Sequence, residues 1–169
     1  MVDSPWDLEQ QLKEKQNAGY NARITAGFCW PWSEPTSSGL VNDVVIGDWA
    51  RPWNNKADRR IGEAPPSALW ATEQGGFGQV GCIYTAQGFE FDWAGVIIGP
   101  DLLWRDGRFI SVRSANRDPQ FRARSQIPDE SFDRLVRHVY KVLLTRGMVG
   151  TVLYSEDAET RDALRMLLS

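Results

Sequence analysis

One stretch decides the fold expected of this chain: Cys82-Ile83-Tyr84-Thr85-Ala86-Gln87-Gly88-Phe89-Glu90-Phe91-Asp92, followed by an apolar run at residues 93–98. Ile83 and Tyr84 favour β structure. Gln87-Gly88 is typical of a tight turn, because glycine lacks the Cβ that would block a positive φ or a close approach. The β-branched end of the apolar run suits a strand buried on both faces of a parallel sheet. We therefore predict strand, turn and strand, with polar groups at a strand end, where open α/β sheets bind ligands.

The rest of the chain predicts helices and further strands around this centre. Helices are expected at residues 4–19, 129–146 and 157–168, and the second has the most regular apolar face. Strands are expected at residues 21–28, 44–46 and 151–154. Asp106-Gly107 between two β-rich runs predicts a hairpin. This order predicts an α/β fold, with a mainly parallel sheet flanked by helices and a β-hairpin insertion.

Length and composition indicate one domain. The 169 residues are 42% apolar and include eight Trp, which is enough for a core. We expect residues 1–169 to form a single domain that begins with a helix within residues 1–20. Residues 49–78 are expected to form an irregular surface segment, and residues 101–128 a hairpin followed by a basic loop.

The charge of the chain is unevenly distributed. The net charge is −3, yet residues 101–146 carry four more basic than acidic residues. This basic part either faces phosphates or is a solvated surface with some ion pairs. Cys29 and Cys82 lack metal-type spacing and are expected to be buried, reduced thiols of a cytosolic protein. No apolar run approaches the ~20 residues that span a bilayer, so we expect no membrane contact and a cytoplasmic location.

Few residues offer catalytic or metal chemistry on their own. His138 is the single histidine, which nearly excludes a catalytic triad or a multi-histidine metal site, and no metal site is predicted. The phosphate-binding pattern G-x-x-x-x-G-K-[ST] does not occur in the chain. Glu90 and Asp92 share a face of an extended segment and, with Asp101, are a weak candidate for a nuclease site.

The run Cys29-Trp30-Pro31-Trp32-Ser33 has two interpretations. Pro31 cannot donate to a sheet ladder, so the run cannot continue a central strand. Two indoles that flank a proline usually form a packed corner of a loop. They could instead form a platform on which a base or ribose stacks.

Two segments together resemble superfamily 1 helicases. The segment Tyr84-Thr85-Ala86-Gln87-Gly88-Phe89-Glu90-Phe91-Asp92 is similar to that family's Q-G-x-E-F-D motif in the second RecA-like domain. The segment Tyr140-Lys141-Val142-Leu143-Leu144-Thr145-Arg146-Gly147 is similar to motif VI, of the form Y-V-A-L-T-R-A. The closest likeness is to an uncharacterised bacterial helicase-like family related to the Schlafen group of ATPases. In it A-R-x-x-A-G-x-C-W-P-W-S recurs, here at residues 22–33, so the resemblance covers nearly the whole chain.

The resemblance implies a RecA-like fold of the P-loop NTPase type, here the second domain of a helicase-like ATPase. In such enzymes ATP and Mg²⁺ lie between two RecA-like domains, and the first, which carries the phosphate-binding loop, is absent from this chain. The chain then resembles a fragment whose helix within residues 1–20 connects it to that missing N-terminal domain. We expect no cofactor and no ATPase activity in this chain alone, with DNA or RNA as a further partner of the parent protein.

The resemblance also implies roles for individual residues. Arg146 would be the catalytic arginine that closes over the γ-phosphate of ATP. The nucleotide-binding residues would be Gln87, Gly88, Glu90 and Thr145. The candidate residues for contact with nucleic acid would be Trp30, Trp32, Tyr84 and Thr85. Gly147 stands where motif VI usually has alanine, and Tyr84 where helicases often have histidine. Another class of function is a non-catalytic module that binds nucleic acid or a protein through the Trp-rich surface and the basic loop.

Overall fold

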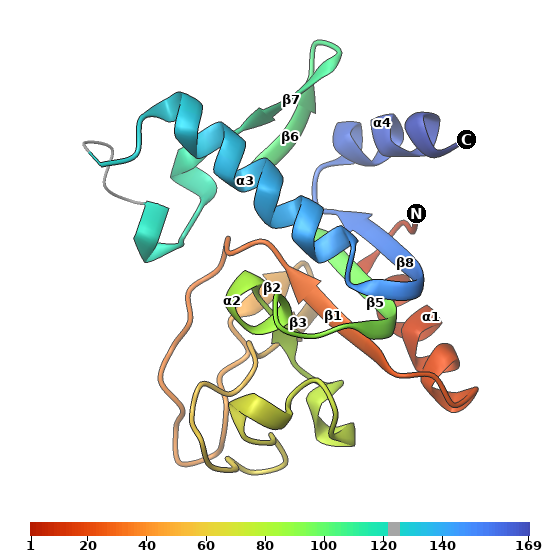
Figure 1. The fold of residues 1–169 in the computed structure, drawn as a ribbon, viewed down its shortest axis with the longest axis vertical. Coiled ribbons are helices and arrows are strands. Elements are labelled where there is room, and N and C mark those ends of the chain that lie inside the picture. Colours follow the sequence, from red (N-terminus) through yellow and green to blue (C-terminus); the bar gives the residue numbers. More distant parts are fainter. Residues whose placement is uncertain (122–125) are drawn as a thin grey trace.

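The computed structural model describes residues 1–121 and 126–169 and shows an α/β fold around a parallel sheet. The sheet has the strand order β4-β1-β5-β8 (Figure 1). Its strands are β1 (Ala22–Ala26), β4 (Val80–Gly81), β5 (Phe91–Ile98) and β8 (Gly147–Ser155). All three pairings in this sheet are parallel. The α/β fold and the parallel sheet flanked by helices are therefore confirmed.

Helices cover both faces of the sheet, as alternate residues of β5 show. Ile97 belongs to the core beneath α1 (Pro5–Asn17), whereas Val96 and Ile98 belong to the core beneath α3 (Asp129–Leu144). In Figure 1, α3 crosses the sheet on the near side, and α4 (Ala158–Leu168) follows β8 near the C-terminus. The three long helices thus lie where the apolar periodicity predicts them.

The first helix packs closely on the sheet. Ser4 caps it by accepting a hydrogen bond from the Asp7 amide at 3.0 Å, and Gly19, at φ +93°, follows its end. Leu8 and Leu12 are fully buried. A Cβ on Gly95 of β5 would lie 2.4 Å from Leu12, so glycine lets the helix approach the strand. The helix predicted as a connection is also part of the core.

The central stretch differs from its prediction. Residues Ile83–Ala86 form a short helix, α2, instead of a strand, and Gln87 caps that helix. The amides of Thr85 and Ala86 both donate to the carbonyl oxygen of Cys82. Burial of Ala86 in the core beneath α3 outweighs the β preference of Ile83 and Tyr84. The predicted turn at Gln87-Gly88 is confirmed, because the Phe89 amide donates to the Ala86 carbonyl oxygen at 3.0 Å, although Gly88 does not have a positive φ.

Two antiparallel hairpins flank the main sheet. One joins β2 (Val44–Ile46) to β3 (Trp49–Arg51), and the other joins β6 (Leu102–Arg105) to β7 (Arg108–Ser111). In the second, Asp106 and Gly107 have φ of 51° and 77°, as a type I′ turn requires. The hairpin predicted from Asp106-Gly107 is therefore confirmed.

The remaining segments are irregular, and in the described part of the chain they include 3₁₀ helices at Ser67–Leu69, Gln74–Gly76, Arg113–Ala115 and Pro119–Phe121. Residues 49–78 begin with β3 and then contain no further strand or α-helix, and they are not all surface, because Trp49, Trp53 and Trp70 are almost fully buried. Arg122 and Arg124 of the predicted basic loop lie outside the described residues. Within the described ranges, no helix is long and apolar enough to cross a membrane.

Candidate functional site

The two segments that carry the helicase resemblance meet at the amino ends of β5 and β8. The Phe91 amide donates to the carbonyl oxygen of Arg146 at 2.9 Å, and Phe91 pairs with Gly147 in the sheet register. Glu90 and Arg146 therefore lie beside one another at one edge of the sheet, although 56 positions separate them in the numbering. This junction is the geometric centre of the candidate site.

The polar residues before β5 are fixed by a backbone hydrogen bond, and their side chains are exposed to solvent. The Gln87 amide donates to the Ile83 carbonyl oxygen at 3.0 Å, which fixes this residue at the end of α2. Gln87, Gly88 and Glu90 are exposed to solvent. A Cβ on Gly88 would meet no atom within 4 Å. No neighbouring atom in the described chain therefore requires glycine at this position. A ligand that approached the backbone closely would be a reason for glycine here.

The Arg146 side chain rests on the end of α3. Its Nε donates to the Val142 carbonyl oxygen at 3.1 Å, and the Thr145 hydroxyl donates to the same oxygen at 3.0 Å. A cation at a helix C-terminus offsets the partial negative charge of the last carbonyl groups. Among the described residues, Arg146 forms no salt bridge, and it is only half-buried. The guanidinium is thus held by neutral groups that an anion can displace.

The glycine that follows Arg146 has a local explanation. A Cβ on Gly147 would lie 2.2 Å from the carbonyl oxygen of Gly150 and 3.0 Å from the amide nitrogen of Ala94. Both atoms belong to the backbone, so they cannot move aside cheaply. The departure from the alanine of motif VI therefore reflects the irregular start of β8, where the register shifts against β5 between Phe91 and Trp93.

The aspartate of the central stretch has a structural role. Asp92 accepts a hydrogen bond from the Asn21 amide at 2.7 Å, and the Trp93 amide donates to the Asn21 carbonyl oxygen at 3.0 Å. These bonds fix the amino end of β1 beside that of β5. The same edge of the sheet therefore spans β1, β5 and β8, with Asn21, Glu90 and Arg146 along it.

The nuclease interpretation fails on distance. Asp101 follows the far end of β5, an eight-residue strand, so roughly 25 Å of extended chain separates it from Glu90 and Asp92. Asp101 is 2% exposed and accepts hydrogen bonds from the Tyr140 hydroxyl at 2.5 Å and from Asn116 at 2.7 Å. Burial raises the pKa of Tyr140 well above its ordinary value. This network closes the carboxyl edge of the sheet.

Tyr84 and Thr85 connect α2 to two other segments. The Tyr84 hydroxyl donates to Asp118 at 2.8 Å, and burial together with this bond raises the pKa of Tyr84. Thr85 donates to the side-chain oxygen of Asn54 at 2.8 Å. Asn54 and Asp118 are each 1% exposed, and nothing in the sequence pattern singles them out. A contact of Tyr84 or Thr85 with nucleic acid remains a prediction.

The tryptophan run forms a packed corner. Trp30 is 9% exposed, and its Nε1 donates to the Val45 carbonyl oxygen at 3.0 Å. Trp32 stacks on the buried Trp53 with ring centroids 5.5 Å apart, and the Lys56 ammonium lies 4.7 Å from the Trp32 centroid. These contacts favour the packing role, and stacking of a base on Trp30 or Trp32 remains a prediction.

Sequence reasoning missed Arg23, which lies in β1 at the same sheet edge and is 1% exposed. The available signal was a charged residue inside a strand made otherwise of small and β-branched residues, Ala22, Ile24, Thr25 and Ala26. A cation in such a run has to find partners within the fold, because burial of an unpaired charge is costly.

Comparisons with known proteins agree with the motifs that meet at this edge. A family model described as Schlafen group 3, DNA/RNA helicase domain, matches residues 1–157. The Saccharomyces cerevisiae protein YPL245W, whose printed name is "Uncharacterized protein", is 30% identical over 169 residues. That match covers 94% of this chain but 35% of the yeast protein, so the chain spans about a third of that relative's length. No solved structure matches. Since the family model takes in both the Gln87–Glu90 segment and Arg146, the chain belongs to the Schlafen group 3 DNA/RNA helicase domain family.

Proposed function

We propose that this chain is the second RecA-like domain of a helicase-like ATPase and supplies one wall of an inter-domain ATP site. The observation that carries the proposal is the Phe91-to-Arg146 hydrogen bond, which joins the two motif segments at one exposed sheet edge. Gln87 and Glu90 are exposed in one of these segments, and Arg146 is half-buried in the other. A surface that closes over a nucleotide needs such polar groups on neighbouring strand ends.

Arg146 is the catalytic residue of this proposal. Its guanidinium stays ionised, and its planar fork matches the oxygens of a phosphate. At rest it donates to the Val142 carbonyl oxygen. A γ-phosphate presented by another domain would exchange that neutral acceptor for an anionic one, so the bound state is electrostatically favoured. Thr145 keeps the helix end in place through its own bonds to Lys141 and Val142.

ATP and Mg²⁺ would be held mainly by the first RecA-like domain, which is the partner that we propose. Among the described residues of this chain, no group of three or more His, Cys, Asp or Glu side chains could hold a metal ion. The exposed Gln87 and Glu90 fit a contact with the ribose, and Gly88 fits a close backbone approach. The isolated chain should bind ATP weakly or not at all, because the phosphate-binding loop supplies most backbone N–H contacts. A tight Mg²⁺-dependent complex by calorimetry would contradict this assignment.

Coupling to DNA or RNA belongs to the same proposal. α2 lies directly before Gln87, and its Tyr84 and Thr85 bind Asp118 and Asn54. A nucleotide that displaces Gln87 would therefore also displace α2 relative to the segments that contain Asp118 and Asn54. The alternative function, a binding module that uses the tryptophan surface, has less support, because Trp30 and Trp53 bury their rings and donate their N–H groups internally.

The test is the kinetics of Arg146 variants in the two-domain protein that joins this chain to a phosphate-loop domain. Arg146→Ala should lower kcat for ATP hydrolysis by roughly 10³–10⁵, with a much smaller change in ATP affinity. Arg146→Lys should restore little, because a point charge on a flexible stem does not reproduce the fork. Arg134→Ala on the exposed side of α3 is the matched control and should leave kcat unchanged. An Arg146→Ala rate that falls only in proportion to the folded fraction would refute the catalytic role.

A further inference from the structure

Arg23 carries a buried positive charge, and the hydrogen bonds that its guanidinium forms within the described chain all go to neutral oxygen atoms. Its guanidinium donates to the carbonyl oxygens of Trp70 at 2.8 Å, Ala22 at 2.7 Å and Glu73 at 2.6 Å, and to the Asn21 side-chain oxygen at 3.0 Å. Within residues 1–121 and 126–169, no carboxylate lies at salt-bridge distance. Burial lowers the pKa of Arg23 to about 10. These bonds use four of the five N–H groups of the guanidinium. The cation therefore lacks a counter-ion.

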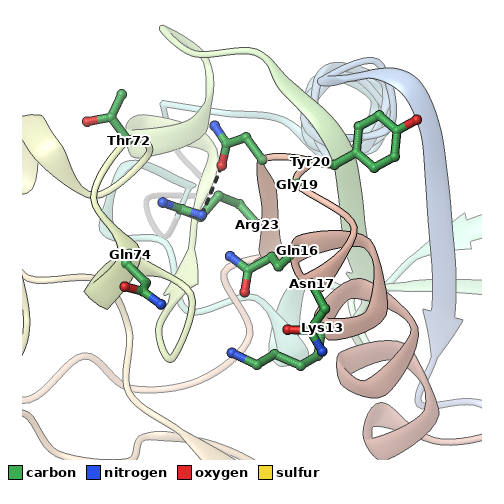
Figure 2. A pocket seen from close by; sticks show the side chains of 9 residues that line it. Lys13, Gln16, Asn17, Gly19, Tyr20, Arg23, Thr72 and Gln74 are labelled. Carbon is green, nitrogen blue, oxygen red and sulfur yellow. Dashed lines mark hydrogen bonds between the residues drawn. The ribbon is translucent and has the colours of Figure 1, made fainter.

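A pocket of about 470 Å³ opens beside this charge, between the end of α1 and the loop around Gln74. In Figure 2, the side chains of Lys13, Gln16, Arg23 and Gln74 are directed into the same space, whereas Tyr20 points away from it. Lys13 and Arg23 are both cations, and no Asp or Glu lines the pocket. Its volume falls within the range of about 300–1,000 Å³ that is typical of small-ligand sites.

The charge of this pocket is local to one side of α1. A second hollow, of about 500 Å³, is lined by Asp3, Asp7 and Glu14 of the same region and contains no Lys or Arg. The chain as a whole is acidic, with a net charge of −3. Two cations without an acid are therefore a specific feature of the pocket and do not follow from a generally basic surface.

We propose that this pocket binds a phosphate group. A tetrahedral phosphate has several acceptor oxygens, so it can accept from the remaining N–H of Arg23, the Lys13 ammonium and the Gln16 and Gln74 amides from different directions. Its negative charge would offset a cation that the fold leaves buried among carbonyl groups. The site does not depend on the proposed ATP function, since it lies at β1 and Arg146 lies two strands away at β8.

A purely structural role for Arg23 makes different predictions. Its bonds to Trp70 and Glu73 clamp residues 70–73 onto β1, so loss of the guanidinium would destabilise the fold with or without a ligand. Lys13 is exposed, and its ammonium lies 5.4 Å from the centroid of the Phe77 ring, so it takes no part in this clamp. Variants of Lys13 and Gln74 therefore test the site without disturbing the clamp.

The experiment is an amide NMR titration of the folded chain with inorganic phosphate against NaCl of equal ionic strength. Phosphate should shift the amides of Asn17, Gly19, Arg23 and Gln74 in a saturable way. Lys13→Ala should weaken this binding by about fivefold or more and Gln74→Ala by a smaller factor, whereas Lys141→Ala removes the same charge from α3 and should leave it unchanged. Arg146→Ala should also leave it unchanged, which separates this site from the proposed ATP site.

Further arms of the titration identify the source of the phosphate. If AMP shifts the same amides and binds with higher affinity than phosphate, the result would support the site and assign it to a nucleotide. A short 5′-phosphorylated oligonucleotide that does so would support it and assign it to a nucleic-acid end. No saturable shift up to tens of millimolar phosphate, or equal weakening by Lys13→Ala and Lys141→Ala, would overturn the proposal.

Discussion

The two edges of the parallel sheet are built differently. At the carboxyl edge, Tyr140 is fully buried, donates to Asp101 and accepts from the Gly99 amide at 2.9 Å. At the amino edge, Gln87 and Glu90 are exposed, and Arg146 is held by a neutral carbonyl group. Open α/β sheets commonly bind ligands at the carboxyl ends of their strands. Here Tyr140, Asp101 and the Gly99 amide satisfy one another at that end, and the exposed Gln87 and Glu90 lie at the other.

The largest expected effect is loss of the closed edge. Tyr140→Phe removes the hydroxyl, leaves the buried Gly99 amide without this partner and leaves the Asp101 carboxylate with the bond from Asn116. An unsatisfied buried group costs about 1–3 kcal/mol, and a lost bond to a charged group a similar amount, so the free energy of unfolding should fall by about 3 kcal/mol. Urea denaturation followed by tryptophan fluorescence measures it.

Tyr84→Phe is the control for this comparison, since it removes the same atom from a tyrosine that is 49% exposed. The tyrosine ring stays partly solvated, and the buried Asp118 keeps the bond from the Gln120 amide, so the cost should be smaller, about 1–2 kcal/mol. Equal losses for the two variants would mean that the carboxyl edge is no more closed than the surface of α2.

A smaller effect separates two glycines of the amino edge. Gly147→Ala places a Cβ against the backbone of Gly150 and should cost about 1–3 kcal/mol through forced displacement of β8. Gly88→Ala meets no atom and should leave stability unchanged or raise it by up to ~1 kcal/mol. Thermal melts of the two variants measure this difference. A destabilised Gly88→Ala would show that the chain itself needs this glycine, and the argument for a ligand beside it would fail.

The long elements could be predicted because their patterns are local. Seven apolar residues between 132 and 144 recur at helical spacing, and four of them, Phe132, Val136, Tyr140 and Leu143, are buried in α3. Asp106-Gly107 requires positive φ at both positions and therefore specifies its hairpin by itself. Such features depend on neighbours in the chain, so the sequence alone is sufficient for them.

The site was only partly predictable because its partners are distant in sequence. Gln87, Glu90 and Arg146 were found through family resemblance, but the bond that joins their segments follows from the register of β5 and β8. α2 forms in a β-favouring sequence because Ala86 enters the core and Thr85 binds Asn54. The need for Gly147 depends on Gly150 and Ala94, which no spacing rule connects to it.

A pH-dependent contribution to stability is expected just after β8, where Asp157 caps α4. The guanidinium of Arg105 beside it holds the pKa of the Asp157 carboxyl well below its usual range, and Asp157 also caps α4 through the Thr160 amide. Because the folded pKa lies below the unfolded value of about 3.9, this stability is present above that value and is lost as pH falls toward the folded pKa. The melting temperatures of wild type and Asp157→Asn should converge between pH 5 and about pH 2. A difference between wild type and Asp157→Asn that stays constant over this range would contradict the shift.

The smallest expected effect is the one that matters most for the proposed function. Arg146→Ala in this chain removes one bond to Val142 and a charge at the end of α3, which together are worth at most about 1 kcal/mol. The melting temperature should therefore fall only slightly, and Arg134→Ala should give a similar value. If Arg146 were a structural residue, its loss would lower the free energy of unfolding of this chain by several kcal/mol. It would then have no specific effect on ATP turnover in the two-domain protein. The measurement is decisive because stability and catalysis make opposite demands on the residue. A side chain that contributes little to its own fold can leave its resting acceptor at little cost and bind a phosphate instead.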